Sequence, residues 1–462
     1  MNTKNLTRNL IAETLTPVPV DHSTRPERAV EAGKRIVQGL MKDYSGPVAV
    51  RLWNGETVIG EPGAYCTVVF NHPRALRDLV LHQDLVRLAE DHLAGAIDIE
   101  GDMESLFSLT EFLQHASWSL KQRLAVLWNA LRLPSDHVHD GSREVRAGRR
   151  ARRNSRSSIA HHYDVSNDFY RLWLDPEMVY SCAYFKDSKQ SLARAQQAKL
   201  DYICRKLRLE PGQTLLDIGC GWGALILWAA RHYGVRAHGI TLSEEQYRYT
   251  LRRIRAEGLG DQVTVELRDY RDLPDQAQYD RVVSVGMFEH IGRKNFDRYF
   301  AIAKRALKPG GLFLNHGITN DTGWRRTSVR RFINRYVFPD GELARISDVS
   351  DAMEKAGFEL LDVESLRRHY ALTLRRWVKS LEMHRNLAVR AAGDKIYRLW
   401  RLYMAGSAYY FEQGSINVYQ VLVGHVGEPL PIPLRRDDIY RDRVHHPALL
   451  TGLPALTAPR RR

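Results

Sequence analysis

A glycine-rich loop is the clearest chemical signal in the sequence. An apolar run at residues 214–218 leads into Gly219, Gly221 and Gly223, and a helical pattern begins directly after them. Glycines at this spacing permit a sharp turn and a close approach of the backbone to a ligand. The pattern is GxGxG, not the GxGxxG of dinucleotide sites, and it lacks the Lys-Ser/Thr pair of a phosphate-binding P-loop. Because Asp217 suits a ligand with an amino group, the loop favours S-adenosylmethionine over a dinucleotide.

Polar side chains after the next two predicted strands extend this cofactor site. The second strand runs into Thr241, and Ser243 with Gln246 three residues later is the pattern of a helix capping box. Gln246 can also reach a ribose hydroxyl. The third strand is followed by Asp269 and Tyr270. We expect these two residues near the adenine, because ligands bind at the carboxyl ends of parallel strands.

The elements that must position these residues are strands and helices in alternation. After residue 158, strands are predicted at 214–218, 236–241, 263–267, 281–285 and 312–315, with helices near 193–208, 223–233, 243–257 and 293–307. Such alternation implies a parallel sheet with helices on both faces. The sequence therefore predicts a doubly wound α/β domain.

A smaller α+β unit is predicted before it. Asn54-Gly55 separates two strand patterns and predicts a two-residue hairpin turn, because both positions of that turn favour positive φ. Further strand patterns lie at 66–70 and 96–101, and a helical pattern begins at Pro73. Apolar residues at helical spacing across 107–132 predict one long helix. Its apolar stripe would pack against this unit or another subunit, or contact a membrane surface.

Composition excludes several classes of protein. The chain has 462 residues, 44% of them hydrophobic and 26% charged, which excludes a disordered chain, a collagen-like repeat and a disulfide scaffold. Its four cysteines are scattered without metal-ligand spacing, so we expect no metal site and a reducing compartment. No apolar run approaches the roughly 20 residues that span a bilayer, and the N-terminus lacks the apolar core of a secretory signal. We therefore expect a soluble, cytoplasmic protein.

Positive charge is the one compositional outlier. Lys and Arg number 68 against 54 Asp and Glu, which gives a formal net charge of +14, and Arg-rich clusters lie at 143–156 and 325–335. Such an excess is either ordinary solvated charge or an attraction to polyanions. Charge alone does not separate nucleic acid from an anionic membrane surface.

A set of motifs from about residue 158 to 425 resembles the cyclopropane-fatty-acyl-phospholipid synthases and their mycolic-acid-modifying relatives. The motifs are His162-Tyr163-Asp164, Asn167-Asp168-Phe169-Tyr170, Tyr180-Ser181-Cys182-Ala183-Tyr184-Phe185, Gln196-Gln197-Ala198-Lys199, Asp217–Gly223, Gly286-Met287-Phe288-Glu289-His290 and Tyr419-Gln420-Val421. The resemblance implies a Rossmann-like class I methyltransferase domain with a mainly helical insertion. It also adds Tyr180, Ser181 and Val285 to the expected cofactor-binding residues.

The resemblance implies a reaction as well as a fold. The methyl carbon of S-adenosylmethionine would be transferred to the double bond of an unsaturated acyl chain on a phospholipid, leaving a carbocation. Because an alkene is a weak nucleophile, the sulfonium must sit close to it in a dry pocket, and aromatic faces can stabilise the cation. By the resemblance, a bound bicarbonate then removes a proton from the new methyl group and the cyclopropane ring closes.

Five residues match the positions that hold bicarbonate in this family. Cys182 and Ile318 would offer backbone groups, while Glu289, His316 and Tyr370 would offer side chains. A lone Glu289 would repel the anion, but a carboxyl paired with a histidine can orient a hydrogen-bond network. Each polar residue taken singly is as readily a satisfied core residue, and the joint match favours the catalytic interpretation.

Two departures from the family pattern leave the product open. Ser407 stands where many members have a cysteine, so no thiol nucleophile is available there and we assign it no catalytic role. Residues 411–417 also differ from the usual pattern. The alternatives to cyclopropanation are a fatty-acyl C-methyltransferase with a methyl-branched or furan-precursor product, and a small-amine N-methyltransferase. A non-enzymatic nucleic-acid-binding role would fit the charge, but Glu289, His316 and Tyr370 argue against it.

Four segments and three partners complete the prediction. We expect a lipid-binding or dimerisation domain, an Arg-rich linker, a methyltransferase domain and a C-terminal tail, at residues 1–133, 134–157, 158–428 and 429–462. The expected partners are phospholipids with unsaturated acyl chains, an anionic membrane surface and a second copy of the chain, with no nucleic acid. The protein would associate peripherally with the inner face of the cell membrane.

Overall fold

The computed structural model describes residues 24–61, 63–135, 166–320, 328–338 and 341–440. Contacts within the chain divide it into two compact units, Met1–Ser142 and Arg143–Arg462. This division falls within the range predicted as a linker. The Arg-rich cluster at 143–156 and the motif at 162–164 lie outside the described residues.

Unit 1 contains a four-stranded sheet with helices packed against it. Strand β1 pairs parallel with β3 and antiparallel with β2, while β3 pairs antiparallel with β4, so the order is β2-β1-β3-β4. The elements are α1 (Thr24–Leu40), β1 (Val48–Arg51), β2 (Thr57–Ile59), β3 (Cys66–Phe70), α2 (Pro73–His82), α3 (Leu85–Leu93), β4 (Ile97–Gly101), α4 (Ser105–His115) and α5 (Leu120–Leu131).

The hairpin between β1 and β2 forms, but the predicted two-residue turn is wrong. Gly55 donates its N–H to the carbonyl oxygen of Leu52 at 2.9 Å, and Leu52 donates to the carbonyl oxygen of Glu56 at 3.0 Å. The loop therefore has three residues, and of Asn54 and Gly55 only Gly55 has a positive φ, at 85°. Asn54 instead accepts the N–H of Glu56 through its side chain at 3.2 Å.

The single long helix predicted over 107–132 is also wrong, because the chain forms two helices there. Ser119 begins α5 with a capping box, in which Ser119 accepts the N–H of Gln122 at 3.3 Å and the Gln122 side chain accepts the N–H of Ser119 at 2.8 Å. A helix start of this kind interrupts the apolar period. Val126 and Ala130 on α5 are buried, whereas Leu120, Leu124, Leu127, Trp128 and Leu131 are 41–72% exposed.

Unit 2 confirms the predicted doubly wound α/β domain. Its described elements before the fourth strand are α7 (Asn167–Arg171), α8 (Leu192–Lys206), β5 (Thr214–Ile218), α9 (Ala224–Tyr233), β6 (Arg236–Thr241), α10 (Glu244–Ala256), β7 (Val263–Leu267) and η2 (Tyr270–Asp272). The later ones are β8 (Tyr279–Val285), η3 (Phe288–His290), η4 (Arg293–Asn295), α11 (Phe296–Ala306), β9 (Leu307–Asn320), α12 (Ser328–Tyr336), α13 (Ile346–Lys355), β10 (Phe358–Ser365), α14 (Arg367–Met383), α15 (Arg385–Ala392), α16 (Asp394–Gln413), β11 (Ile416–His425) and α17 (Asp437–Tyr440).

The seven strands of unit 2 lie in the order β10-β11-β9-β8-β5-β6-β7. Pairing is parallel from β9 through to β7, whereas β11 runs antiparallel to both of its neighbours. Successive buried side chains of the inner strands belong to two different cores. Leu215 and Val283 face the core shared with α8, α9 and α10, and Leu216 and Val282 face the core shared with α11 and α13. This two-residue period places helices on both faces of the sheet.

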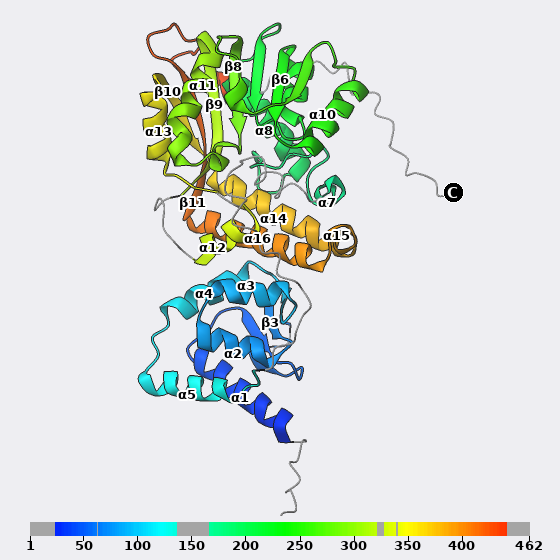
Figure 1. Cartoon of the computed structure of the whole chain (residues 1–462), viewed down its shortest axis with the longest axis vertical. Coiled ribbons are helices and arrows are strands. Elements are labelled where there is room, and N and C mark those ends of the chain that lie inside the picture. The colour runs from blue at the N-terminus through cyan, green and yellow to red at the C-terminus, as the bar shows by residue number, and fades with distance from the viewer. Residues whose placement is uncertain (1–23, 62, 136–165, 321–327, 339–340, 441–462) are drawn as a thin grey trace, which may run out of the picture. The chain divides into compact units, whose positions relative to one another are not determined.

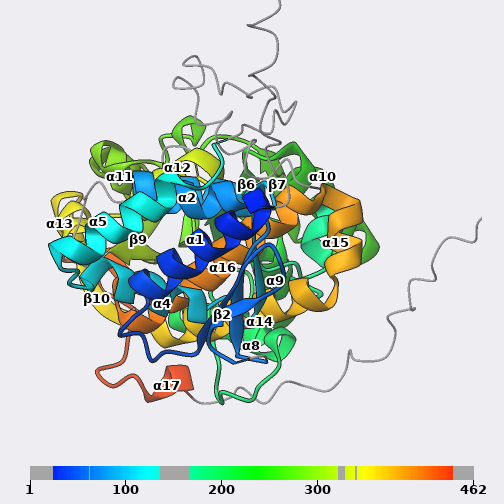
Figure 2. The same cartoon turned by 90° about the horizontal axis from the view of Figure 1, so that it is seen from below.

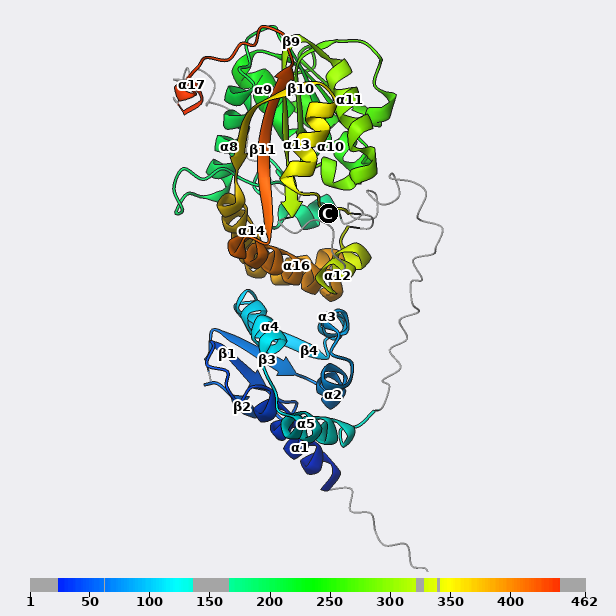
Figure 3. The ribbon, with the colours of Figure 1, turned by 90° about the vertical axis from the view of Figure 1, so that its left-hand side faces the viewer.

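The helical insertion predicted for this domain comprises α14, α15 and α16, which follow β10 and precede β11 in the sequence. The three helices lie together in space (Figures 1, 2 and 3). Asn320 at the end of β9 pairs with Ile416 at the start of β11, and Ser365 at the end of β10 pairs with Tyr419. The insertion is therefore attached at the carboxyl ends of the parallel strands, the edge at which ligands bind in such sheets.

The described part of the predicted tail, residues 429–440, is packed against the rest of unit 2. Ile439 in α17 is 2% exposed, and Arg205 on α8 donates a hydrogen bond to its carbonyl oxygen. Arg208 also contacts Asp438 at 3.1 Å. In the described part of the chain, no helix combines the length and apolar character that a membrane crossing requires.

Candidate active site

A cavity lies at the carboxyl ends of β5, β6, β7 and β8. Almost all of the predicted cofactor-binding residues line it, namely Tyr180, Ser181, Asp217, Gly219, Gly221, Thr241, Gln246, Asp269, Tyr270 and Val285. Gly223 is the exception. The structure thus brings residues from five separate segments of the chain around one space, as expected for a ligand site at this edge of the sheet.

The three glycines of the loop have different structural roles. Gly219, Gly221 and Gly223 all have positive φ, at 85°, 56° and 83°. Among the described atoms, none lies within 4 Å of the place where a Cβ of Gly221 would be, so a side chain there would project into open space beside the loop. A Cβ on Gly223 would instead lie 2.5 Å from Cγ2 of Thr250 on α10. Gly223 therefore permits close helix packing, while Gly221 faces the ligand space.

Asp217 places a buried carboxyl group at the end of β5. The side chain is 3% exposed, and its Oδ1 atom has no hydrogen-bond partner within the described structure. Burial raises the pKa of Asp217 to about 7, against the opposing charge of Lys199. An orphaned buried acceptor of this kind is suited to a ligand that brings its own N–H donors.

The residues after β6 form a small hydrogen-bond network in place of the predicted capping box. Ser243 accepts the N–H of Gln246 at 3.3 Å, as predicted. The reciprocal bond is not formed, because Gln246 Oε1 accepts from the Thr241 hydroxyl at 2.8 Å, and that hydroxyl accepts the N–H of Ser243 at 3.2 Å. Both Thr241 and Gln246 are thereby fixed in the cavity wall.

Asp269 is held by an arginine that the sequence did not single out. Arg271 contacts both carboxylate oxygens of Asp269, with Nε–Oδ1 at 2.9 Å and Nη2–Oδ2 at 2.5 Å. Tyr270 is buried beside this pair and meets Tyr299 edge-on at 5.2 Å. The pair fixes the carboxylate at the cavity wall, and Arg271 itself is a lining residue.

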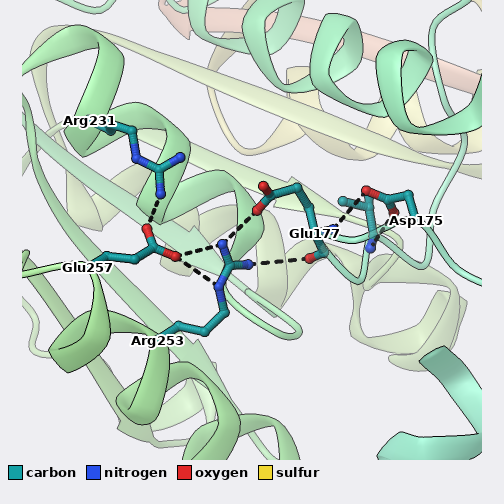
Figure 4. A network of polar contacts seen from close by, with 6 residues as sticks. Asp175, Glu177, Arg231, Arg253 and Glu257 are labelled. Atoms are coloured by element: carbon teal, nitrogen blue, oxygen red, sulfur yellow. Dashed lines mark hydrogen bonds and ion pairs between the residues drawn. The ribbon is translucent and has the colours of Figure 1, made fainter. Parts of the chain in front are cut away.

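The segment that precedes Tyr180 is held by polar contacts with α10, which in turn contacts α9 (Figure 4). Asp175, which is 4% exposed, accepts two backbone N–H groups from the residues that follow it, at 2.9 and 3.1 Å. Arg253 on α10 contacts Glu177 Oε2 at 2.6 Å and Glu257 Oε1 at 2.7 Å. Arg231 on α9 also pairs with Glu257. These contacts fix the backbone just before the cavity.

Glu289 and His316 form a second polar group. Glu289 Oε1 accepts the N–H of Ile318 at 2.7 Å, so that backbone donor is engaged by the carboxyl group. Gln420 donates to Nδ1 of His316 at 3.2 Å, which leaves the proton of a neutral imidazole on Nε2. Within the described structure, neither Glu289 Oε2 nor His316 Nε2 has a hydrogen-bond partner, although both atoms are buried.

Burial determines the charge of both groups. It raises the pKa of Glu289 to about 7, with the Ile318 N–H opposing this shift. It also lowers the pKa of His316 well below its ordinary value, with the charges of Lys199 and Lys206 acting in the same direction. The histidine is therefore neutral at physiological pH, and a substantial fraction of the glutamate carries a proton.

Cys182 and Tyr370 lie in an apolar cluster that Ile318 borders. Burial raises the pKa of the Cys182 thiol, whose Sγ lies 3.3 Å from the carbonyl oxygen of Ala183. Tyr370 on α14 is buried and packs against Phe411, with ring centroids 4.6 Å apart. Ile318 therefore connects this cluster with Glu289, whose carboxyl group accepts its N–H, and with His316 on the same strand. In the described ranges, no group of three or more His, Cys, Asp or Glu side chains could hold a metal ion.

Tyr403 is a site residue that sequence reasoning missed. Burial raises the pKa of Tyr403 to about 12, with the charge of Glu289 adding to the shift and the hydroxyls of Tyr180 and Ser407 opposing it. The spacing of Tyr403 and Ser407, one turn apart on a single helix, was the available signal.

Comparison with known proteins agrees with this geometry. A family model described as mycolic acid cyclopropane synthetase matches residues 150–421. The chain belongs to this family. It is similar to a probable fatty acid methyltransferase of Pseudomonas putida, at 41% identity over 404 residues, which cover 86% of this chain and 96% of that protein. That match extends beyond unit 2 into unit 1.

Two further relatives connect the family to lipid methylation. The cyclopropane-fatty-acyl-phospholipid synthase of Escherichia coli (strain K12) is 42% identical over 263 residues, which cover 56% of this chain and 66% of that protein. The solved structure of mycolic acid cyclopropane synthase CmaA1 complexed with SAH and CTAB has 35% identity and a TM-score of 0.55, and covers 58% of this chain and 97% of that one. The protein described here is therefore an S-adenosylmethionine-dependent methyltransferase of the cyclopropane-fatty-acyl-phospholipid synthase type.

Proposed function

We propose that this protein converts double bonds in phospholipid acyl chains to cyclopropane rings. The observation that carries the proposal is the pair of buried, unpartnered atoms, Glu289 Oε2 and His316 Nε2, next to the segments that wall the cofactor cavity. Methyl transfer itself needs the cofactor site, and the carbocation that it leaves must then lose a proton. Ring closure also needs a base, and this pair is suited to holding one.

The residues of the cavity fit S-adenosylmethionine. Asp217 offers an orphaned acceptor for the amino group, and the open space at Gly221 admits the methionine portion. Gln246 would reach the ribose through its amide nitrogen, because its Oε1 atom is occupied by Thr241. When bound, the cofactor supplies an electrophilic methyl group on a sulfonium.

The second polar group fits bicarbonate. His316 Nε2 offers an N–H donor, and Glu289 Oε2 accepts when ionised and donates when protonated. Because burial raises the pKa of Glu289 to about 7, the protonated form is available to receive an anion without charge repulsion. When bound, bicarbonate supplies the base that takes a proton from the new methyl group. Tyr180 and Tyr403 would present aromatic rings to the positive charge on the acyl chain.

An isotope experiment tests the proposal. With methyl-deuterated S-adenosylmethionine, a cyclopropane product retains two of the three deuterons, because ring closure removes one. Glu289→Leu, which removes the polar group that would hold bicarbonate, should reduce turnover about 10²–10⁴-fold, as expected for loss of base catalysis, while leaving S-adenosylhomocysteine affinity unchanged. A product that retains all three deuterons would overturn the proposal.

One observation favours a second candidate, a fatty-acyl C-methyltransferase that leaves a methyl branch. The relative from Pseudomonas putida that matches over 96% of its length bears the name probable fatty acid methyltransferase. The branch forms if the carbocation loses a proton from a neighbouring chain carbon, which leaves a double bond, so olefinic proton signals in NMR distinguish this product from a ring of the same mass. Retention of all three deuterons would support this candidate.

We also propose that α5 attaches the protein peripherally to an anionic membrane surface. Its exposed face carries Leu124, Leu127 and Trp128 with two further leucines, and the exposed side chains of Lys121 and Arg123 lie on the same helix. No acidic residue occurs between Glu111 and residue 135. An apolar stripe with Trp and flanking cations is the composition of an interfacial helix.

Vesicle sedimentation tests this attachment. Binding should require anionic lipid and weaken as salt rises. The double variant Leu124→Ser, Trp128→Ser should lose most of it, whereas Leu434→Ser, which removes a fully exposed leucine from unit 2, should bind like the wild type. If the double variant binds vesicles normally but loses a dimer in light scattering, the face joins two copies of the chain instead.

A further inference from the structure

A buried lysine in the cofactor cavity has no role in the function described so far. Lys199 on α8 is 2% exposed, and it lines the cavity together with Ser181 and Asp217. Burying an ammonium group without an opposite charge in contact is costly. A buried ammonium group in the cavity wall is therefore expected to have a counter-ion when the cavity is filled.

The partners of Lys199 satisfy it only in part. Its Nζ atom donates to the Ser181 hydroxyl at 2.9 Å, although an ammonium group has three donors. Lys199 and Asp217, both in the described part of the chain, form no direct ion pair, and Asp217 Oδ1 has no hydrogen-bond partner there. Burial lowers the pKa of Lys199 to about 8, with the charges of Asp175, Cys182 and Asp217 opposing the shift.

A cation and an anion thus lie in one cavity wall without neutralising each other. A ligand that carries both charges on neighbouring atoms would satisfy both residues at once, and the amino-acid end of S-adenosylmethionine is such a zwitterion. Its ammonium group is complementary to Asp217 and its carboxylate to Lys199.

We propose that Lys199, together with the Ser181 hydroxyl, binds the α-carboxylate of the cofactor. This inference rests on the proposed cofactor site and identifies the residue that binds the amino-acid end of the cofactor. The carboxylate would bring an opposite charge into direct contact with Lys199, and charge-assisted hydrogen bonds of this kind are the stronger ones. Lys199 would then help to hold the methionine portion in place at the cavity wall.

A purely structural role is the competing explanation, and the chain offers a matched control for it. Gln196 lies one turn before Lys199 on α8 and donates to the carbonyl oxygens of Ser181 at 2.9 Å and Val179 at 3.4 Å. It anchors the same segment but does not line the cavity. A variant of Gln196 therefore disturbs the anchoring without removing the charge.

Calorimetric titration with two ligands separates the explanations. S-adenosylhomocysteine and its decarboxylated analogue differ only in the α-carboxylate. The wild type should bind the former at least tenfold more tightly, Lys199→Met should bind both about equally, and Lys199→Arg should keep part of the preference. Gln196→Met should weaken both ligands together and keep the preference. Thermal unfolding without ligand checks that each variant is folded.

The possible failures are distinguishable. If Lys199→Met keeps the wild-type preference for the carboxylate, or weakens both ligands by the same factor, Lys199 does not bind the carboxylate and the inference is overturned. If the wild type binds neither ligand, the cofactor site in the proposed function is overturned instead.

Discussion

The buried carboxyl of Glu289 predicts an unusual dependence of stability on pH. Below pH 4.5, its ordinary pKa, the residue is protonated in both the folded and the unfolded chain and has no effect. Between that value and about 7, the unfolded chain releases the proton while the folded chain keeps it. Folding stability contributed by this residue therefore falls as pH rises, and above pH 7 the loss remains constant.

The size of the effect follows from the two pKa values. Each unit of difference corresponds to about 1.4 kcal/mol, so the interval from 4.5 to about 7 corresponds to roughly 3 kcal/mol at high pH. Part of this loss has already occurred at pH 5. Between about pH 5 and about pH 8, we therefore expect a change of about 2.5 kcal/mol from this one residue.

Glu289→Gln isolates this contribution, because an amide does not titrate and its oxygen can still accept the Ile318 N–H. Denaturant unfolding should show the variant gaining about 2.5 kcal/mol relative to the wild type between about pH 5 and about pH 8, in bicarbonate-free buffer without cofactor. Glu359→Gln, which removes a glutamate from the exposed side of β10, is the control. A difference between Glu289→Gln and the wild type that stays constant with pH would refute the assignment of a raised pKa to Glu289.

Three further variants test the surrounding framework. Gly221→Val should abolish S-adenosylhomocysteine binding in calorimetry, since its side chain would enter the open space beside the loop; unchanged affinity would contradict the loop assignment. Gly223→Ala should lower the free energy of unfolding by about 1–3 kcal/mol, because its Cβ would meet Thr250 at positive φ. Adding Thr250→Ala should restore part of that loss, and no restoration would count against the steric cause. Arg253→Met should accelerate hydrogen exchange in the segment around Glu177, and unchanged exchange would show that the ion pairs do not hold that segment.

The parallel core of unit 2 could be predicted from the sequence because its pattern is local. The strands at 214–218, 236–241 and 263–267 have the predicted limits, since each is a short apolar run followed by a helical period. Strand β10 was not predicted, as its largely intermediate or exposed side chains give it no clear apolar pattern. Strand β11, which contains the Tyr419-Gln420-Val421 motif, was not predicted as a strand either, because its pairing partners are distant in sequence.

The same distinction applies to the site. Residues of the glycine loop could be found by spacing, and Glu289, His316 and Tyr370 by motif. The roles of Gly223 and Ile318 could not be predicted, because they depend on Thr250 and Glu289, which other segments bring into contact. The two helices in place of the long one over 107–132 follow from the capping box at Ser119, a local signal within the apolar stripe.

The attachment of the helical insertion determines how the insertion is coupled to the cofactor cavity. The chain leaves the sheet after Ser365, which lies opposite Tyr419, and returns to it at Ile416, which pairs with Asn320 of β9; Leu366 donates to the carbonyl oxygen of Val418 at 2.8 Å. The register of β10 and β11 is thus set outside the insertion. Helix α14 is nevertheless coupled to the cofactor cavity, because Thr373 accepts the N–H of Ala183 at 3.0 Å and His369 accepts the N–H of Phe185 at 2.9 Å, directly after the cavity residues Tyr180 and Ser181. A change in the packing of the insertion would therefore reach the cofactor cavity through this segment while the register of the sheet stays in place.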